Sequence, residues 1–256
     1  MKRYLLRTWA LWVRGLMLAP LSVSLVALFT GYAYAAVKFA RTYGGANEDL
    51  VWSVRQTSDG GYILVGRTTS FGAGSRDVFL IKTYANGSVQ WAKTYGATDW
   101  EECYSVQQTS DGGYILSCQK AFSSGSDFSN ALLIKIDAYG DLQWAKTYGG
   151  TAAEGFALVR QTSDGGYIAV GWTWSPELSA GNNDFFVVKT DAYGSVQWAK
   201  TYGGAGLDLA HSVQQTSDGG YIIAGWTTSF GAGSYDFLLI KTDANGNAQW
   251  AKAYGG

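Results

Sequence analysis

Few side chains in this 256-residue chain could act as nucleophiles, proton carriers or metal ligands. His211 is the only histidine, so a metal site built from several imidazoles is excluded. The sequence has no Cys-x-x-Cys pair, no Walker A motif and no Gly-x-Gly-x-x-Gly motif. Carboxylates in turns leave room for a Ca²⁺ site, although the Asp-Ala-Asn-Gly turn at 243–246 is shorter than an EF-hand loop. We therefore predict no catalytic residue and no cofactor.

The two cysteines, Cys103 and Cys118, lie symmetrically about one turn. If Thr109 and Gly112 flank a two-residue hairpin turn, the cysteines face each other across two strands, whereas a longer turn shifts that register. Outside the cytoplasm such a pair can form a disulfide. The alternative is two buried thiols that pack as small apolar side chains.

Residues 1–35 differ from the rest of the chain. Four basic residues accompany an apolar run from Leu16 to Phe29, and Ala33-Tyr34-Ala35 follows. This order is typical of a secretory signal peptide, so we expect a secreted or cell-surface protein. The alternative is a retained membrane anchor, but a spanning helix needs about 20 apolar residues. After signal cleavage no membrane insertion is expected, and 15 basic against 20 acidic residues do not favour nucleic acid as a partner.

A seven-residue stretch, Thr-Ser-Asp-Gly-Gly-Tyr-Ile, organises the remaining chain. It begins at Thr57, Thr109, Thr162 and Thr216, at spacings of 52, 53 and 54 residues. A period of this length indicates tandem repeats, and the Asp-Gly-Gly sequence favours a tight hairpin turn. We divide residues 36–256 into units 46–97, 98–150, 151–204 and 205–256, preceded by a leading strand at 37–45 that resembles the end of each unit.

Each unit predicts four short strands. In the last unit they cover 209–216, 221–229, 236–242 and 248–254, separated by turns rich in Gly, Ser, Asp and Asn. The third strand is so continuously apolar that we expect both of its faces to be buried. One four-stranded antiparallel sheet cannot bury both faces alone, so the sheets should pack as blades around an axis. The predicted fold is an all-β propeller of four blades of about 52 residues plus one N-terminal strand.

Charged residues that recur in every unit are predicted to hold the blades rather than to perform chemistry. Such positions carry an acid after each Tyr-Gly-Gly or its variant (Asp49, Glu101, Glu154 and Asp208) and a lysine on the third strand (Lys82, Lys135, Lys189 and Lys241). Ligand specificity is expected where the units differ, because variable side chains on a constant frame can form a binding face. Two such positions supply the candidate ligand-binding residues. The position in the first strand carries Trp52, Tyr104 and His211, with Ala157 in the third unit, and the position in the second strand carries Arg67, Gln119, Trp172 and Trp226.

The repeated sequences, above all Asp-Gly-Gly-Tyr-Ile and Gln-Trp-Ala-Lys-Thr-Tyr-Gly-Gly, resemble those of secreted bacterial and archaeal β-propeller-repeat proteins over residues 37–256. This resemblance implies the fold and says little about activity. Asp-Ala-Asn-Gly-Asn-Ala-Gln-Trp at 243–250 is similar to the tryptophan-docking motif of quinoprotein propellers. Thr-Ser-Asp-Gly-Gly-Tyr-Ile is similar to the Asp-box of sialidase-type propellers, where the box is a structural turn.

The number of blades leaves the closure of the ring open. Four units and a leading strand make either a closed four-blade ring with a surplus strand or an incomplete, assembling ring, and we favour the second. Open blade edges would then permit self-association. The favoured function is a non-enzymatic binding or adhesion scaffold for protein or carbohydrate. The alternatives are a quinoprotein-type or glycosidase-type enzyme, or a fragment of a larger propeller protein. The five arginines after the leader are dispersed over the chain, which does not favour a sialidase.

Overall fold

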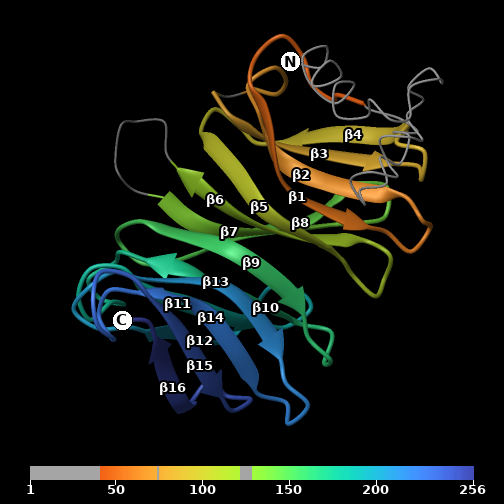
Figure 1. Cartoon of the computed structure of the whole chain (residues 1–256). Helices are drawn as coiled ribbons and strands as arrows, with labels where there is room; N and C mark the ends of the chain where they lie inside the picture. Colours follow the sequence, from red (N-terminus) through yellow and green to blue (C-terminus); the bar gives the residue numbers. More distant parts are fainter. Residues whose placement is uncertain (1–40, 74, 122–128) are drawn as a thin grey trace, which may run out of the picture. The chain divides into compact units, whose positions relative to one another are not determined.

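The structure is a computed structural model that describes residues 41–256, apart from 74 and 122–128. The predicted signal peptide and most of the predicted leading strand lie outside the described residues. Residues 43–256 form one compact unit, and the described part of the chain contains sixteen strands and no helix. The strands form four antiparallel sheets of four, as predicted, and each sheet pairs its strands in chain order (Figure 1).

Each sheet is one blade. Blade 1 contains β1 (Asp49–Gln56), β2 (Tyr62–Thr68), β3 (Asp77–Thr83) and β4 (Val89–Tyr95). Blade 2 contains β5 (Trp100–Gln108), β6 (Tyr114–Ala121), β7 (Ser129–Ile136) and β8 (Leu142–Tyr148). Blade 3 contains β9 (Glu154–Gln161), β10 (Tyr167–Thr173), β11 (Asp184–Thr190) and β12 (Val196–Tyr202). Blade 4 contains β13 (Asp208–Gln215), β14 (Tyr221–Thr227), β15 (Asp236–Thr242) and β16 (Ala248–Tyr254).

The repeated Thr-Ser-Asp-Gly-Gly stretch is the hairpin between the first two strands of each blade. In blade 1, Gly61 N and Thr57 Oγ1 both donate to Asp59 Oδ1, at 3.0 and 2.5 Å. Gly60 has a φ of +80°, a conformation that favours glycine. The third-strand lysine donates to the same aspartate at 2.8 Å in all four blades, as Lys82–Asp59, Lys135–Asp111, Lys189–Asp164 and Lys241–Asp218. The repeated charges therefore hold each hairpin to its own blade.

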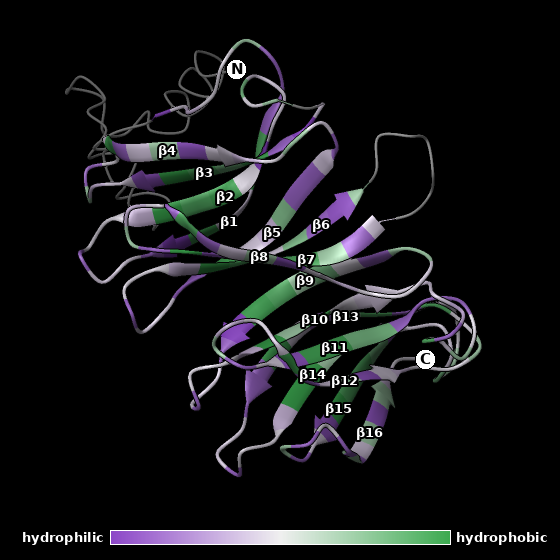
Figure 2. Ribbon diagram, turned by 180° about the vertical axis from the view of Figure 1, so that it is seen from behind, coloured by the Kyte–Doolittle hydropathy of each residue, from purple (hydrophilic) through white to green (hydrophobic). Residues whose placement is uncertain are grey.

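Apolar side chains between successive blades make the core. One cluster joins blades 1 and 2, another blades 2 and 3, and a third blades 3 and 4. In blades 1 to 3 the tryptophan of the outer strand packs against the tyrosine of the next blade's hairpin; Trp91 and Tyr114 have ring centroids 6.2 Å apart. Figure 2 shows the central strands β11 and β14 as largely hydrophobic, whereas the outer strand β4 carries hydrophilic segments. We call the face covered by the following blade the forward face, and the face covered by the preceding blade the backward face.

Within the described residues, the two terminal blades each have one open face, so the four blades do not close a ring. Val106, Val159 and Val213 occupy one backward-face position and are 0 to 2% exposed, whereas their equivalent Val54 is 51% exposed. On the forward face, Val78, Ala131 and Phe185 are fully buried, whereas Phe237 is 75% exposed. Blades 1 and 4 lie at opposite ends of the described part in both views (Figures 1 and 2).

The open faces correct one expectation. The third strand of blade 3, β11, is buried along its whole length, as predicted from its apolar run. In β15 every second side chain is exposed or half-buried, beginning with Phe237. The sequence of β15 is as apolar as that of β11, but burial on both faces requires a neighbouring blade on each side, and blade 4 has one only on its backward face.

Candidate functional site

A β-bulge in the first strand of every blade positions the variable side chains. In β1, Val51 pairs with Gly66 and Ser53 pairs with Val65, which leaves Trp52 as the extra residue. The same irregularity leaves Tyr104, Ala157 and His211 unpaired in β5, β9 and β13. A bulge redirects the side chain of the extra residue, and bulges often lie beside functional sites. The position that differs among the repeats is thus also the one that the backbone turns out of the regular strand.

A glycine opposite the bulge gives the first strand room in three blades. A Cβ atom added to Gly66 would lie 1.8 Å from the carbonyl oxygen of Leu50, and Gly171 and Gly225 meet equivalent carbonyls at 1.8 and 1.9 Å. Blade 2 has Cys118 at this position, and it is bonded to Cys103 across the strand pair. The close approach of the two backbones is therefore maintained by glycine in three blades and accompanied by a disulfide in the fourth.

The bulge residues converge on one cavity of about 310 Å³, which we call the inner-strand cavity. It brings together four of the seven predicted ligand-binding residues, namely Trp52, Tyr104, Trp172 and His211. Phe156, Ala157, Leu209 and Ala210 complete its lining. The cavity therefore draws on blades 1 to 4 and is mainly aromatic and apolar.

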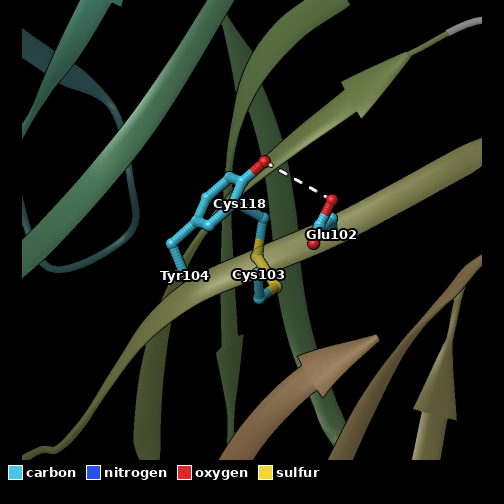
Figure 3. The surroundings of a disulfide bond; sticks show 4 residues. All are labelled: Glu102, Cys103, Tyr104 and Cys118. Carbon is cyan, nitrogen blue, oxygen red and sulfur yellow. Dashed lines mark hydrogen bonds between the residues drawn. A yellow bond between two sulfur atoms is a disulfide. The ribbon is translucent and has the colours of Figure 1, made fainter. Parts of the chain in front are cut away.

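Glu102 supports one wall of the inner-strand cavity from behind. Its carboxylate is buried and accepts hydrogen bonds from Trp52 Nε1 at 2.5 Å and from Arg67 Nη1 at 3.3 Å. The Tyr104 hydroxyl also points toward it, with an oxygen–oxygen distance of 3.5 Å (Figure 3). Burial and this carboxylate raise the pKa of Tyr104 well above its ordinary value, so the phenol remains protonated. Glu102 thus fixes both aromatic rings that blades 1 and 2 contribute.

The predicted polar residues Arg67 and Gln119 act behind the wall rather than in the cavity lining. Arg67 is held between Glu102 and Glu48, with its Nη2 atom 2.6 Å from Glu48 Oε1. Gln119 donates to Ser129 Oγ at 2.6 Å and receives a hydrogen bond from Tyr104. Both side chains are therefore committed to neighbours within the protein, and neither is arranged as a free ligand contact.

The remaining predicted residue, Trp226, lies elsewhere. Its ring packs edge-on against Tyr235, with centroids 5.0 Å apart. Together with Phe237 and Tyr254 it lines a separate hollow of about 550 Å³ on the open face of blade 4. The second variable position is thus not a single site, because only Trp172 reaches the inner-strand cavity.

His211 reaches solvent at the inner-strand cavity without a charged partner in its lining. Neighbouring groups partly desolvate the imidazole. Because desolvation penalises the charged form, the pKa of His211 is lowered below its ordinary value. This shift favours the neutral form of the imidazole. No Asp, Glu, Lys or Arg side chain is among the residues that line the cavity, and Arg67 is paired with its two carboxylates outside this lining.

Glu102 and Phe156 are site residues that the sequence analysis did not select. Glu102 occupies a place held by Leu50, Gly155 and Leu209 in the other blades, so the criterion of differences among units would have found it. Phe156 lies beside the bulge residue Ala157 and stacks on Phe186 at 5.6 Å. Its role follows from the bulge itself, which the sequence does not reveal.

Within the described residues, no group of three or more His, Cys, Asp or Glu side chains is placed to hold a metal ion. In the same part of the chain, no helix has the length and apolar character needed to cross a membrane.

A match to a protein-family model agrees with the β-propeller fold and assigns no activity. Residues 216–248 match a family model described as a beta-propeller domain of unknown function, and this stretch spans the last Thr-Ser-Asp-Gly-Gly-Tyr-Ile hairpin together with β14 and β15. The chain is also similar to a solved protein of unknown function from Bacteroides caccae, with a TM-score of 0.41 and 11% identity over 80% of this chain and 81% of that one. No curated protein matches.

Proposed function

We propose that this protein is a non-enzymatic binding and adhesion module that acts outside the cytoplasm and binds its ligand in the inner-strand cavity. The observation that carries this proposal is the convergence of the bulge residues Trp52, Tyr104 and His211 with Trp172 on one cavity. The bulge position is one at which the four units differ, and there the side chains of different blades face a common space. A volume of about 310 Å³ is at the lower end of the range of small-molecule sites, which is about 300–1,000 Å³.

The lining favours a neutral ligand with a flat apolar surface, such as a sugar ring. Trp52 is half exposed and its ring is tilted against Tyr104 at a centroid distance of 6.2 Å, while Trp172 joins the lining from β10 of blade 3. Aromatic rings bury a large apolar area and keep a polar edge for hydrogen bonding, which suits the apolar face and hydroxyls of a saccharide. The lining contains no Lys or Arg side chain, which disfavours an anionic ligand.

Binding is better supported than hydrolysis. A glycosidase of the usual kind needs two carboxyl groups that flank the scissile bond. The residues that line the inner-strand cavity include no Asp or Glu, and the carboxylate behind its wall, that of Glu102, is bonded to Trp52 and Arg67. The location outside the cytoplasm is supported by the Cys103–Cys118 disulfide, since such bonds persist mainly in oxidising compartments.

The test is a titration of the protein with neutral oligosaccharides, in which binding is measured by calorimetry and by tryptophan fluorescence. Trp172→Ala should abolish binding, because Trp172 lines the cavity. The substitution leaves the hydrogen bonds of Glu102 in place, because these come from Trp52, Arg67 and Tyr104. The matched control is Trp174→Ala, because Trp174 is 50% exposed and lies outside the cavity. Equal affinity of the wild type and Trp172→Ala would refute the site. Binding of a protein ligand lost in Trp172→Ala, without saccharide binding, would keep the site and change the ligand class.

A further inference from the structure

The two open faces of this molecule are the two halves of an interface that it already makes three times. Forward face meets backward face between blades 1 and 2, 2 and 3, and 3 and 4. The uncovered forward face belongs to blade 4 and the uncovered backward face to blade 1. We propose that two copies of this chain associate head to tail, with blade 4 of one copy covering the backward face of blade 1 in the other. This association is separate from ligand binding in the inner-strand cavity.

The apolar parts of the two faces are complementary in size. At the interface between blades 3 and 4, the ring of Phe185 reaches over Gly225, where an added Cβ atom would lie 2.6 Å from it. Phe237 is the equivalent of Phe185, and Gly66 is the equivalent of Gly225. In the proposed contact the ring of Phe237 therefore lies over Gly66, beside Val51. Phe237 and Val51 are 75% and 58% exposed in the single chain, so both gain burial on association.

A backbone-to-side-chain hydrogen bond recurs at every internal interface. The amide of the serine in one hairpin donates to a glutamine Oε1 in the next blade, as Ser58–Gln108, Ser110–Gln161 and Ser163–Gln215 at 2.8, 2.8 and 2.9 Å. The fourth serine of the series is Ser217, and the glutamine at the matching place in blade 1 is Gln56. Both residues are exposed in the single chain. The proposed contact pairs them across the two copies.

Lysines of the outer strands follow the same rule. Lys93, Lys146 and Lys200 each donate to the residue after the glycine in the last hairpin turn of the next blade, to Asp141, Ser195 and Asn247 at 2.5, 3.4 and 3.0 Å. Lys252 is the fourth lysine and is exposed, and the matching residue of blade 1 is Ser88. The open faces therefore agree in polar partners as well as in apolar shape.

One segment of the chain already occupies part of the docking position. Tyr95, Tyr148 and Tyr202 donate through their hydroxyls to a glycine carbonyl in the next blade, at 2.7, 2.8 and 2.5 Å. Tyr43 makes the same bond to Gly87 of blade 1 at 2.5 Å. In the proposed contact, the hydroxyl of Tyr254 in the second copy donates to the carbonyl of Gly87 in place of Tyr43. Residues 43–45 must therefore yield to residues 254–256 of the incoming copy, which makes Tyr43 a competitor of association.

The first experiment measures molar mass by light scattering and sedimentation over increasing concentrations of the full chain. The wild type should associate, and Phe237→Ser should remain monomeric. Phe237 is 75% exposed, so its replacement should not impair folding, and Tyr193→Ser removes a 76% exposed ring from a hairpin turn as the matched control. The control should associate like the wild type. Association that Phe237→Ser leaves unchanged would overturn the proposal, as would monomeric wild type and Tyr43→Phe at millimolar concentration.

The second experiment tests the direction of the contact. Phe237→Asp spoils only the forward face and Val51→Asp only the backward face, so each variant alone should be monomeric. An equimolar mixture should form a heterodimer, because each variant retains the face that the other has lost. A contact between two identical blade 4 faces would instead let Val51→Asp self-associate and leave the mixture without heterodimer, and this result would overturn the head-to-tail arrangement.

The third experiment uses the competing tyrosines. Tyr43→Phe weakens the contact that residues 43–45 make with blade 1 and should raise the association constant. Tyr254→Phe weakens the contact that residues 254–256 of the incoming copy would make there and should lower the association constant. Each substitution removes one hydrogen bond, whose net contribution corresponds to about a fivefold change in an equilibrium constant. Shifts of the same sign in both variants would contradict the proposed exchange.

Discussion

The disulfide between Cys103 and Cys118 offers a quantitative test of how blade 2 is held together. The bond links adjacent strands of the first hairpin in that blade, and the two cysteines are 15 residues apart in sequence. Closing a loop of that length in the unfolded chain removes conformational entropy worth about 3 kcal/mol. Both cysteines are fully buried, so the reduced thiols would still pack as small apolar groups. Reduction should therefore lower the free energy of unfolding by about 3 kcal/mol.

A double substitution separates the cross-link from the packing. Cys103→Ala with Cys118→Gly copies the pair that blade 4 carries at the same place, Ala210 and Gly225. Urea denaturation of the wild type and of this variant, each with and without reductant, gives the two required differences. The variant should be insensitive to reductant and close in stability to the reduced wild type. It retains a side-chain pair that the protein already accommodates in another blade.

The reasoning fails if reductant releases two thiols from the denatured wild type and yet leaves its urea midpoint unchanged. It also fails if the double variant responds to reductant, because no cysteine would then remain to explain the effect. A loss far above about 3 kcal/mol would mean that the reduced thiols disturb the bulge at Tyr104 rather than merely release the unfolded chain.

Two further predictions concern the frame. Burial would raise the pKa of Asp164, but hydrogen bonds from Lys189 and Thr162 outweigh it and lower the pKa to about 2; the stabilisation is therefore present above about pH 4 and is lost as the pH falls toward 2. Urea denaturation at both pH values should show a smaller acid loss in Asp164→Asn, and an equal loss would contradict the assignment. Gly171→Ala places a Cβ atom 1.8 Å from the carbonyl oxygen of Gly155 and should cost about 1–3 kcal/mol in thermal or urea unfolding, whereas an unchanged midpoint would show that the strands can separate.

The strand order was predictable because its signals are local. Each hairpin is specified by an aspartate that accepts from the backbone and by a glycine with positive φ, as in Asp59 and Gly60. The expectation that the repeated lysines hold the blades follows the same logic, since a residue constant in every unit serves what every unit shares. These features need no knowledge of how the blades are arranged.

The bulges were not predictable, and they decide the site. Cys103 and Cys118 were expected to face each other only if the turn had two residues, but the hairpin closes between Thr109 and Gly113 and is one residue longer. The bulge at Tyr104 restores the register, so the right partners meet for a different reason. The same bulge turns the variable side chain toward the inner-strand cavity. Sequence differences thus identified Trp52, Tyr104 and His211, while the backbone feature that unites them remained hidden.

The error for β15 has a similar origin. Its alternating exposure depends on whether a blade covers the forward face of blade 4, and no residue within the strand records that. Trp226 was selected by the same rule as Trp172, yet it lines the hollow on this open face. Position in the array, rather than residue type, separates the two tryptophans.

The most direct test of the central claim, that the bulge residues form a binding cavity, is calorimetric titration of the full chain with neutral oligosaccharides, comparing the wild type with Trp172→Ala and Trp174→Ala. Binding by the wild type and by Trp174→Ala, and its loss in Trp172→Ala, is the predicted result. Equal binding by all three proteins, or binding lost only in Trp174→Ala, would contradict the claim, because the ligand would then be held outside the inner-strand cavity.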